Sequence, residues 1–184
     1  DQPRPEFDSY FADLSRCPSL AAQLDVQIPV ESSRGCWWGE KHHCTFCGLN
    51  GLGMAYRRKS PDRAYDELQA LSEQYGIATF FNTDNILDLR YFGTLFPRLK
   101  QERRRLRLYY ESKANLKRSQ LLLLRDTGTD WLQPGLESLS SHVLALMDKE
   151  PGLAGQAGRD AAAEAKTRWM AESVAQRASR SSAC

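Results

Sequence analysis

The chain has 184 residues and a formal net charge of +2, with 41% hydrophobic and 26% charged residues. This length suffices for one domain with a hydrophobic core. The near-neutral charge gives no general electrostatic case for nucleic-acid binding, and no apolar run approaches the roughly 20 residues that a membrane span requires. We therefore expect a globular domain whose partners are neither nucleic acid nor membrane.

The first 25 residues are predicted to be a linker, because Pro3 and Pro5 lie in a polar stretch. The chain begins with Asp1 rather than methionine, so we expect a piece of a longer protein, or a processed or incomplete sequence. Residues 26–33 are predicted to form a short strand that leads into a cysteine-rich loop.

A helix is predicted to begin at Ser60-Pro61, because serine is a favoured N-cap and proline fits the first helical turn. Gly76 is expected to end this helix. Its apolar positions recur at helical spacing and are Ala64, Leu68, Leu71 and Tyr75. The apolar residues 77–81 follow as a second strand.

The same order of helix and strand then repeats. The second helix has a predicted kink at Pro97, and its apolar positions are Leu89, Phe92, Leu95, Phe96 and Leu99. A third strand is indicated by alternation at Leu106, Leu108 and Tyr110. A leucine-rich helix over 116–126, a strand over 130–133 and a fourth helix follow, the last lined by Leu139, Val143, Leu146 and Met147. Alternating strands and helices predict an α/β fold with four parallel βα units.

The composition changes near Pro151, and residues 150–184 form an atypical tail. Its last 34 residues contain ten alanines and show no strand pattern. An alanine-rich helix over roughly 160–176 is one interpretation, and a frameshifted or truncated coding sequence is another; the two are compatible. The fourth strand, near Trp131, is therefore expected to lack its next neighbour in the sheet.

Three of the five cysteines, Cys36, Cys44 and Cys47, follow the spacing C-x7-C-x2-C, and a glycine-rich stretch over 48–53 comes next. Three thiolates in one loop suit a metal or an iron–sulfur cluster. A 4Fe–4S cluster normally has four cysteine ligands, so three would leave one iron open. We expect these cysteines to lie together at one end of the sheet, with Cys17 and Cys184 elsewhere.

Two other interpretations of the loop remain open. A zinc ion would use the same three cysteines with His42 or His43. A structural disulfide is disfavoured by the odd number of cysteines and by the missing signal peptide. Cysteines that are not paired favour a reducing, cytoplasmic location.

The stretch over 31–51, ESSRGCWWGEKHHCTFCGLNG, resembles the cluster loop of the radical SAM superfamily. Most members use C-x3-C-x2-C. The longer first gap resembles the cobalamin-dependent branch that matures ribosomally made peptides, many members of which are described as C-methyltransferases. The similarity runs from about Phe7 to about Lys149.

The resemblance implies a partial TIM-like barrel over 26–149 that binds a 4Fe–4S cluster through Cys36, Cys44 and Cys47. It also implies S-adenosylmethionine at the open iron, a precursor peptide as substrate and a reducing electron donor as partner. Cobalamin is implied for the longer parent protein, in a domain preceding the linker over 1–25.

Polar residues follow the predicted strands, where the working residues of parallel α/β folds gather. By resemblance, four of them, together with Gly48 of the cysteine loop, approach or bind S-adenosylmethionine; the four are Asp84, Glu111, Glu137 and Ser138. Turn chemistry at Gly48, an Asx turn at Asp84 and a helix cap at Ser138 or Ser140 are the alternatives. No residue is assigned a catalytic role.

The leading hypothesis is a radical SAM enzyme domain that C-methylates a peptide. A non-catalytic remnant that keeps the cluster site is the second hypothesis, and a zinc-binding interaction module is the third. Because the predicted barrel is incomplete, we expect weak or no turnover from this chain alone.

Overall fold

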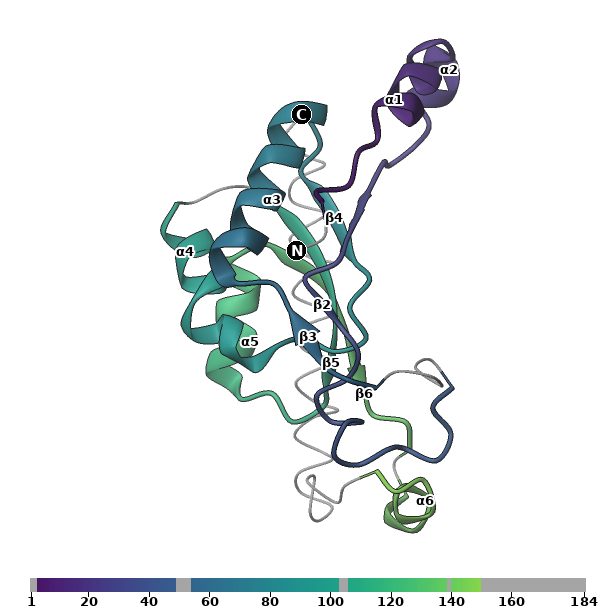
Figure 1. Ribbon diagram of the computed structural model, residues 1–184, viewed down its shortest axis with the longest axis vertical. Helices are drawn as coiled ribbons and strands as arrows, with labels where there is room; N and C mark the ends of the chain where they lie inside the picture. The colour runs from purple at the N-terminus through teal and green to yellow at the C-terminus, as the bar shows by residue number, and fades with distance from the viewer. Residues whose placement is uncertain (1–2, 49–53, 103–105, 139, 150–184) are drawn as a thin grey trace, which may run out of the picture.

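The computed structural model describes residues 3–48, 54–102, 106–138 and 140–149. Over these residues the chain forms a four-stranded parallel sheet with α3, α4 and α5 on one side, and a separate two-stranded antiparallel ribbon (Figure 1). The predicted α/β architecture with four parallel strands is confirmed. The alanine-rich tail over 150–184, including Cys184 and the helix predicted over 160–176, lies outside the described residues.

The strands of the parallel sheet follow one another in chain order. They are β1 (Ile28–Val30), β4 (Thr79–Asn82), β5 (Arg107–Lys113) and β6 (Thr129–Gly135), in the order β1-β4-β5-β6. In the described part of the chain β6 pairs with β5 alone. As predicted, the strand that contains Trp131 therefore lies at the edge of this sheet.

The first large helix forms as local sequence signals require. It is α3 (Pro61–Tyr75), and the Ser60 hydroxyl accepts a hydrogen bond from the Arg63 N–H at 3.2 Å. Gly76 ends the helix with a φ of 67°, in the left-handed region that glycine adopts without strain. The remaining helices that cover this side of the sheet are η1 (Leu89–Gly93), α4 (Leu95–Gln101) and α5 (Arg118–Asp126).

The hydrophobic core lies between these helices and one face of the sheet. Alternate residues of β5 point into it, so Leu108 and Tyr110 are fully buried while Tyr109 is only half-buried. The opposite face carries Phe81, which is 39% exposed and stacks on Tyr109 with ring centroids 4.3 Å apart. The sheet therefore has a covered face and, within the described residues, a more open one.

The strand predicted over 26–33 is shorter than expected. It ends at Val30, and Ser33–Arg34 form β2, which pairs with β3 (Arg57–Arg58) in the antiparallel ribbon. The break follows from hydrogen bonding, because Ser32 and Ser33 donate their backbone N–H groups to the Asp84 carboxylate. Those groups are then not available to the sheet.

The second helix also differs from its prediction. The break falls at Thr94, between η1 and α4, rather than at Pro97. Pro97 is the third residue of α4, where a backbone N–H has no partner within the helix in any case. The carboxyl ends of β5 and β6 extend further than predicted, because β5 continues through Glu111 to Lys113 and β6 continues beyond Gln133 to Gly135.

The fourth helix is α6 (Ser141–Leu146), and its buried side was predicted incorrectly. Leu144 is buried, whereas Leu146 is 67% exposed. The helix has fewer than two turns, so its position is set by contacts with a loop and not by a broad apolar stripe. The predicted position Leu139 lies outside the described residues.

The N-terminal segment predicted as a linker contains two short helices, α1 (Asp8–Ser15) and α2 (Pro18–Ala21). Phe11 stacks on Tyr75 at the end of α3, with ring centroids 4.6 Å apart, and the Tyr75 hydroxyl donates to Asp8 at 2.7 Å. Among the described residues, no helix is both long enough and apolar enough to cross a membrane.

Candidate metal centre

The cysteine loop connects β2 to β3, and the pairing of these two strands closes the loop at its base. Ser33 pairs with Arg58 and Arg34 with Arg57, and the residues between these pairs include all three cysteines of the motif. Gly35 forms the neck with a φ of 83°, and a Cβ atom on it would lie 2.4 Å from the Ala55 carbonyl oxygen. Figure 1 shows the loop reaching beyond the ribbon towards α6.

The Cys36 end of the loop is held by the sheet. The Trp37 indole N–H donates to the carbonyl oxygen of Leu87, beyond β4, at 3.1 Å. The Lys113 ammonium, at the end of β5, lies 3.0 Å from the centroid of the Trp38 ring. The Gly39 N–H donates to the Cys36 sulfur at 3.3 Å. The first cysteine is therefore tied to the carboxyl ends of β4 and β5.

The other end of the loop is held by α6. Thr45, between the second and third cysteines, donates its N–H to the Met147 carbonyl oxygen at 3.0 Å and its hydroxyl to the Leu146 carbonyl oxygen at 3.3 Å. These are carbonyl groups at the end of a helix, which have no partner within the helix. The Lys149 ammonium lies 5.6 Å from the centroid of the Phe46 ring. Cys44 and Cys47 thus depend on an anchor separate from that of Cys36.

The three thiols are free and half-buried. Burial raises the pKa of Cys44, the Lys149 charge lowers it, and the Cys36, Cys47 and Glu137 charges raise it. Cys17 is exposed and lies at the start of α2, which Figure 1 shows at the opposite end of the molecule from the loop.

The donor set fits an iron–sulfur cluster. Within residues 3–48, 54–102, 106–138 and 140–149, no three His, Cys, Asp or Glu side chains come close enough to hold a single metal ion. Three thiolates in one loop are the ligand type that iron–sulfur clusters use, and zinc accepts the same ligands. Of the two histidines proposed for zinc, His42 stacks on Trp38 with ring centroids 4.8 Å apart.

Asp84 lies at the same edge of the sheet but faces its interior, and it is only 1% exposed. One carboxylate oxygen accepts the backbone N–H groups of Ser32 at 2.7 Å and Ser33 at 3.0 Å, and the other accepts the Ser32 hydroxyl. The carboxylate therefore holds the turn at which the chain leaves β1 for the cysteine loop. Its predicted contact with a cofactor stays a prediction.

Burial raises the pKa of Asp84 to about 6, although hydrogen bonds from Ser32 and Ser33 act in the opposite direction. A carboxyl with a higher pKa in the folded state than its unfolded value of about 3.9 stabilises the fold at low pH. This contribution is lost as the pH rises through about 6. Relative to Asp84→Asn, we expect the wild-type free energy of unfolding to fall by roughly 1–3 kcal/mol between about pH 4 and about pH 7.

Urea denaturation of both proteins across that pH range measures the difference. Because asparagine does not titrate, the pH dependence of the Asp84→Asn variant measures the contribution of all other titratable groups of the chain. Parallel curves for the two proteins would show that the pKa of Asp84 is the same in the folded and unfolded states.

Glu137 lies near Cys44, and Glu111 lies near Glu137. The Glu111 carboxylate makes a long contact of 3.4 Å with the Tyr109 hydroxyl, and its pKa is raised by burial and by the Glu137 charge. Glu137 has a φ of 53° and lies 2.5 Å from the Lys149 ammonium. Because the Glu137 charge acts on both Cys44 and Glu111, the structure brings these three side chains to one edge of the sheet.

Ser138 and Gly48 have local surroundings that do not require a ligand. The Ser138 hydroxyl accepts the Ser140 N–H at 3.1 Å, and Ser140 in turn caps α6 by accepting the Val143 N–H at 3.4 Å. Gly48 is exposed, and a Cβ atom on it would meet no described atom within 4 Å. Their contacts with S-adenosylmethionine stay predictions, as do those of Glu111 and Glu137.

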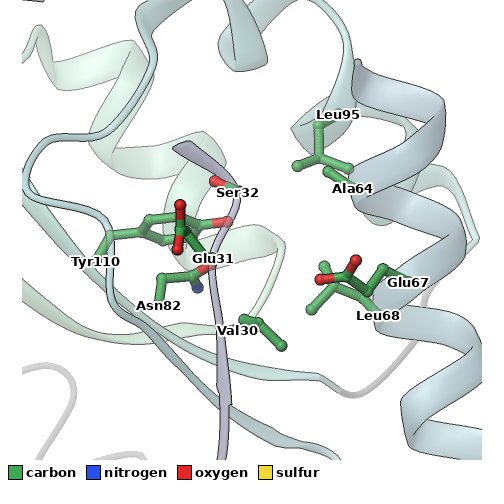
Figure 2. Close-up of a pocket in the computed structure, with 9 residues that line it drawn as sticks. All are labelled: Val30, Glu31, Ser32, Ala64, Glu67, Leu68, Asn82, Leu95 and Tyr110. Atoms are coloured by element: carbon green, nitrogen blue, oxygen red, sulfur yellow. The ribbon is translucent and has the colours of Figure 1, made fainter. Parts of the chain in front are cut away.

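A small pocket lies away from the cysteines, on the covered face of the sheet. Figure 2 shows Asn82, Ser32 and Tyr110 on one side of it, and Ala64, Leu68 and Glu67 of α3 on the other. It has room for about one water molecule, which is far too little for a nucleoside. We therefore do not place a cofactor there.

Sequence analysis assigned no role to several residues that hold the loop, namely Ser32, Ser33, Trp37, Trp38 and Thr45. A signal existed for the two serines, because polar residues directly follow β1 at its carboxyl end. No local signal identified Thr45, since its partners lie about a hundred residues further along the chain.

A parallel α/β sheet with three free thiols in one loop beside its carboxyl edge defines a candidate iron–sulfur protein. The family model of the radical SAM superfamily matches residues 30–154, well over half of the chain. The chain belongs to this superfamily. No curated protein and no solved structure matches it.

Proposed function

We propose that this chain is a radical SAM enzyme domain in which Cys36, Cys44 and Cys47 hold a 4Fe–4S cluster with one open iron. The observation that carries the proposal is the position of these free thiols, in one loop at the carboxyl edge of a parallel sheet. When bound and reduced, such a cluster supplies the electron for cleavage of S-adenosylmethionine.

The surrounding residues have distinct tasks in this proposal. The Gly39 N–H stabilises a thiolate at Cys36 by donating to its sulfur, and the Lys149 charge favours the thiolate of Cys44. Glu111, at the end of β5, has acceptor capacity beyond its long contact with Tyr109. We assign it to the ammonium or ribose hydroxyl groups of the cofactor, with Glu137 and Ser138 as further contacts.

The finer assignment is C-methylation of a ribosomally made precursor peptide, with a reducing electron donor as partner and cobalamin bound elsewhere in a longer parent protein. Its support is the resemblance of the loop over 31–51 to the cobalamin-dependent branch. The open sheet face, with Phe81 stacked on Tyr109, offers apolar surface beside the site for a substrate side chain.

Anaerobic reconstitution with iron and sulfide tests the proposal. We expect about four irons per chain, followed by formation of 5′-deoxyadenosine when S-adenosylmethionine and a strong reductant are added. A cluster without cofactor cleavage would indicate the non-catalytic remnant. One tightly held zinc ion with no bound iron would indicate the zinc-binding module.

The edge position of β6 gives the remnant hypothesis its specific support. Parallel strands are usually covered on both faces and at their edges, and the described part of this chain leaves β6 paired on one side. We therefore expect cofactor cleavage by the 184-residue chain to be slow. Rapid multiple turnover would show that the 184-residue chain suffices for catalysis.

A further inference from the structure

The contacts between Asp84 and the Ser32-Ser33 turn connect two parts of the chain that are far apart in sequence. Asp84 follows β4, and the serines follow β1, 51 and 52 residues earlier. All three residues are buried. Three donors, two from the backbone and one hydroxyl, converge on one carboxylate. Such charge-assisted hydrogen bonds are about twice as strong as neutral ones.

The held turn leads directly to the first cysteine. Only Arg34 and Gly35 stand between Ser33 and Cys36, so the Cα atoms of Ser33 and Cys36 are at most about 11 Å apart. Arg34 is paired in the ribbon with Arg57, and Gly35 packs against Ala55. The path from Asp84 to Cys36 therefore contains no unrestrained residue.

Cys44 and Cys47 have no such path from Asp84. Eight and eleven positions after Cys36, they are held through Thr45 by the carbonyl groups of Leu146 and Met147. A change at Asp84 should therefore act on one cysteine of the motif and leave the other two in place.

We propose that Asp84 is a positioning residue that sets the place of Cys36 relative to Cys44 and Cys47. This inference rests on the proposed function, because the relative placement of the three thiols matters for holding one cluster. Asp84 acts through the Ser32-Ser33 turn and touches neither the thiols nor the cluster.

The geometry of the contacts distinguishes this role from a direct contact with a charged cofactor group. An asparagine at position 84 can accept both backbone N–H groups through its oxygen and donate its N–H to the Ser32 hydroxyl, which both donates and accepts. Asp84→Asn therefore keeps the turn in place without the charge. Asp84→Ala removes all three contacts.

Limited alkylation of the reduced, cluster-free chain in native buffer provides the test. Trypsin cleaves after Arg34, Lys41 and Arg57, so Cys36 is released on a different peptide from Cys44 and Cys47. Mass spectrometry then gives a separate rate for each peptide, and the exposed Cys17 serves as the internal reference. The measured quantity is the alkylation rate of Cys36 relative to that of the peptide with Cys44 and Cys47.

We expect Asp84→Ala to raise this ratio on the order of tenfold, because the turn then opens without the rest of the fold. Asp84→Asn should keep the wild-type ratio. Thr127→Val is the control for lost stability, since it removes a buried hydrogen bond to the Leu124 carbonyl oxygen at the far end of α5. It should leave the ratio unchanged.

An unchanged ratio in folded Asp84→Ala, or an equal rise for all three cysteines, would overturn the inference. So would an asparagine variant that behaves like the alanine variant. If Asp84→Ala does not fold, Ser32→Ala replaces it, and a ratio equal to wild type would then overturn the inference. The assay needs no cluster, so a failure of the wild-type chain to bind iron would count against the proposed function alone.

Discussion

Replacing Cys36, Cys44 or Cys47 singly by serine is expected to reduce reconstituted iron from about four per chain to less than about one. In the proposed cluster each thiolate would bind a different iron, and a serine hydroxyl is a far weaker ligand for iron at neutral pH. Because the loop has two separate anchors, loss of one thiol leaves the other two held but unable to retain the cluster. Iron and sulfide analysis after anaerobic reconstitution measures the loss.

Cys17→Ser is the matched control for this series. Cys17 is exposed and lies at the start of α2, so its removal should leave iron content unchanged. Equal loss of iron in Cys17→Ser, or full iron content in any of the three motif variants, would contradict the assignment of the ligands. Two further variants, His42→Ala and His43→Ala, distinguish the zinc hypothesis from the cluster hypothesis. If the site binds zinc through one of these histidines, its replacement would also release the metal.

Gly35→Ala is expected to destabilise the chain by roughly 2–4 kcal/mol and to prevent the loop from closing correctly. Two physical effects add. The φ of 83° lies in the left-handed region that side chains with a Cβ rarely adopt, and the new Cβ atom would lie 2.4 Å from the Ala55 carbonyl oxygen. Because the Ala55 oxygen belongs to the backbone, it cannot rotate away as a side chain would. The chain at Gly35 and the chain at Ala55 must therefore move apart.

Urea denaturation measures the loss of stability, and iron content after reconstitution measures the effect on the site. Gly93→Ala is the control, because a Cβ atom there meets no described atom within 4 Å and the φ is not in the left-handed region. We expect the control to match wild type in both measurements. A Gly35→Ala variant as stable as Gly93→Ala would show that the neck adjusts without cost.

The features that sequence predicted well are those that neighbouring residues determine. Serine, proline and glycine at fixed positions delimit α3, because caps depend on groups within four residues. The alternation along β5 identified its buried residues, because side chains of a strand point to opposite faces. The cysteine spacing placed all three candidate ligands in one loop, which the pairing of β2 with β3 closes, while their role as ligands stays a prediction.

The features that needed the tertiary structure depend on partners distant in the chain. The end of β1 at Val30 is decided by Asp84, which competes for the backbone N–H groups of Ser32 and Ser33. The position of Cys44 and Cys47 is decided by Thr45 and the end of α6. No local pattern encodes a hydrogen bond between residues 50 or 100 positions apart, because its strength depends on how the intervening chain packs.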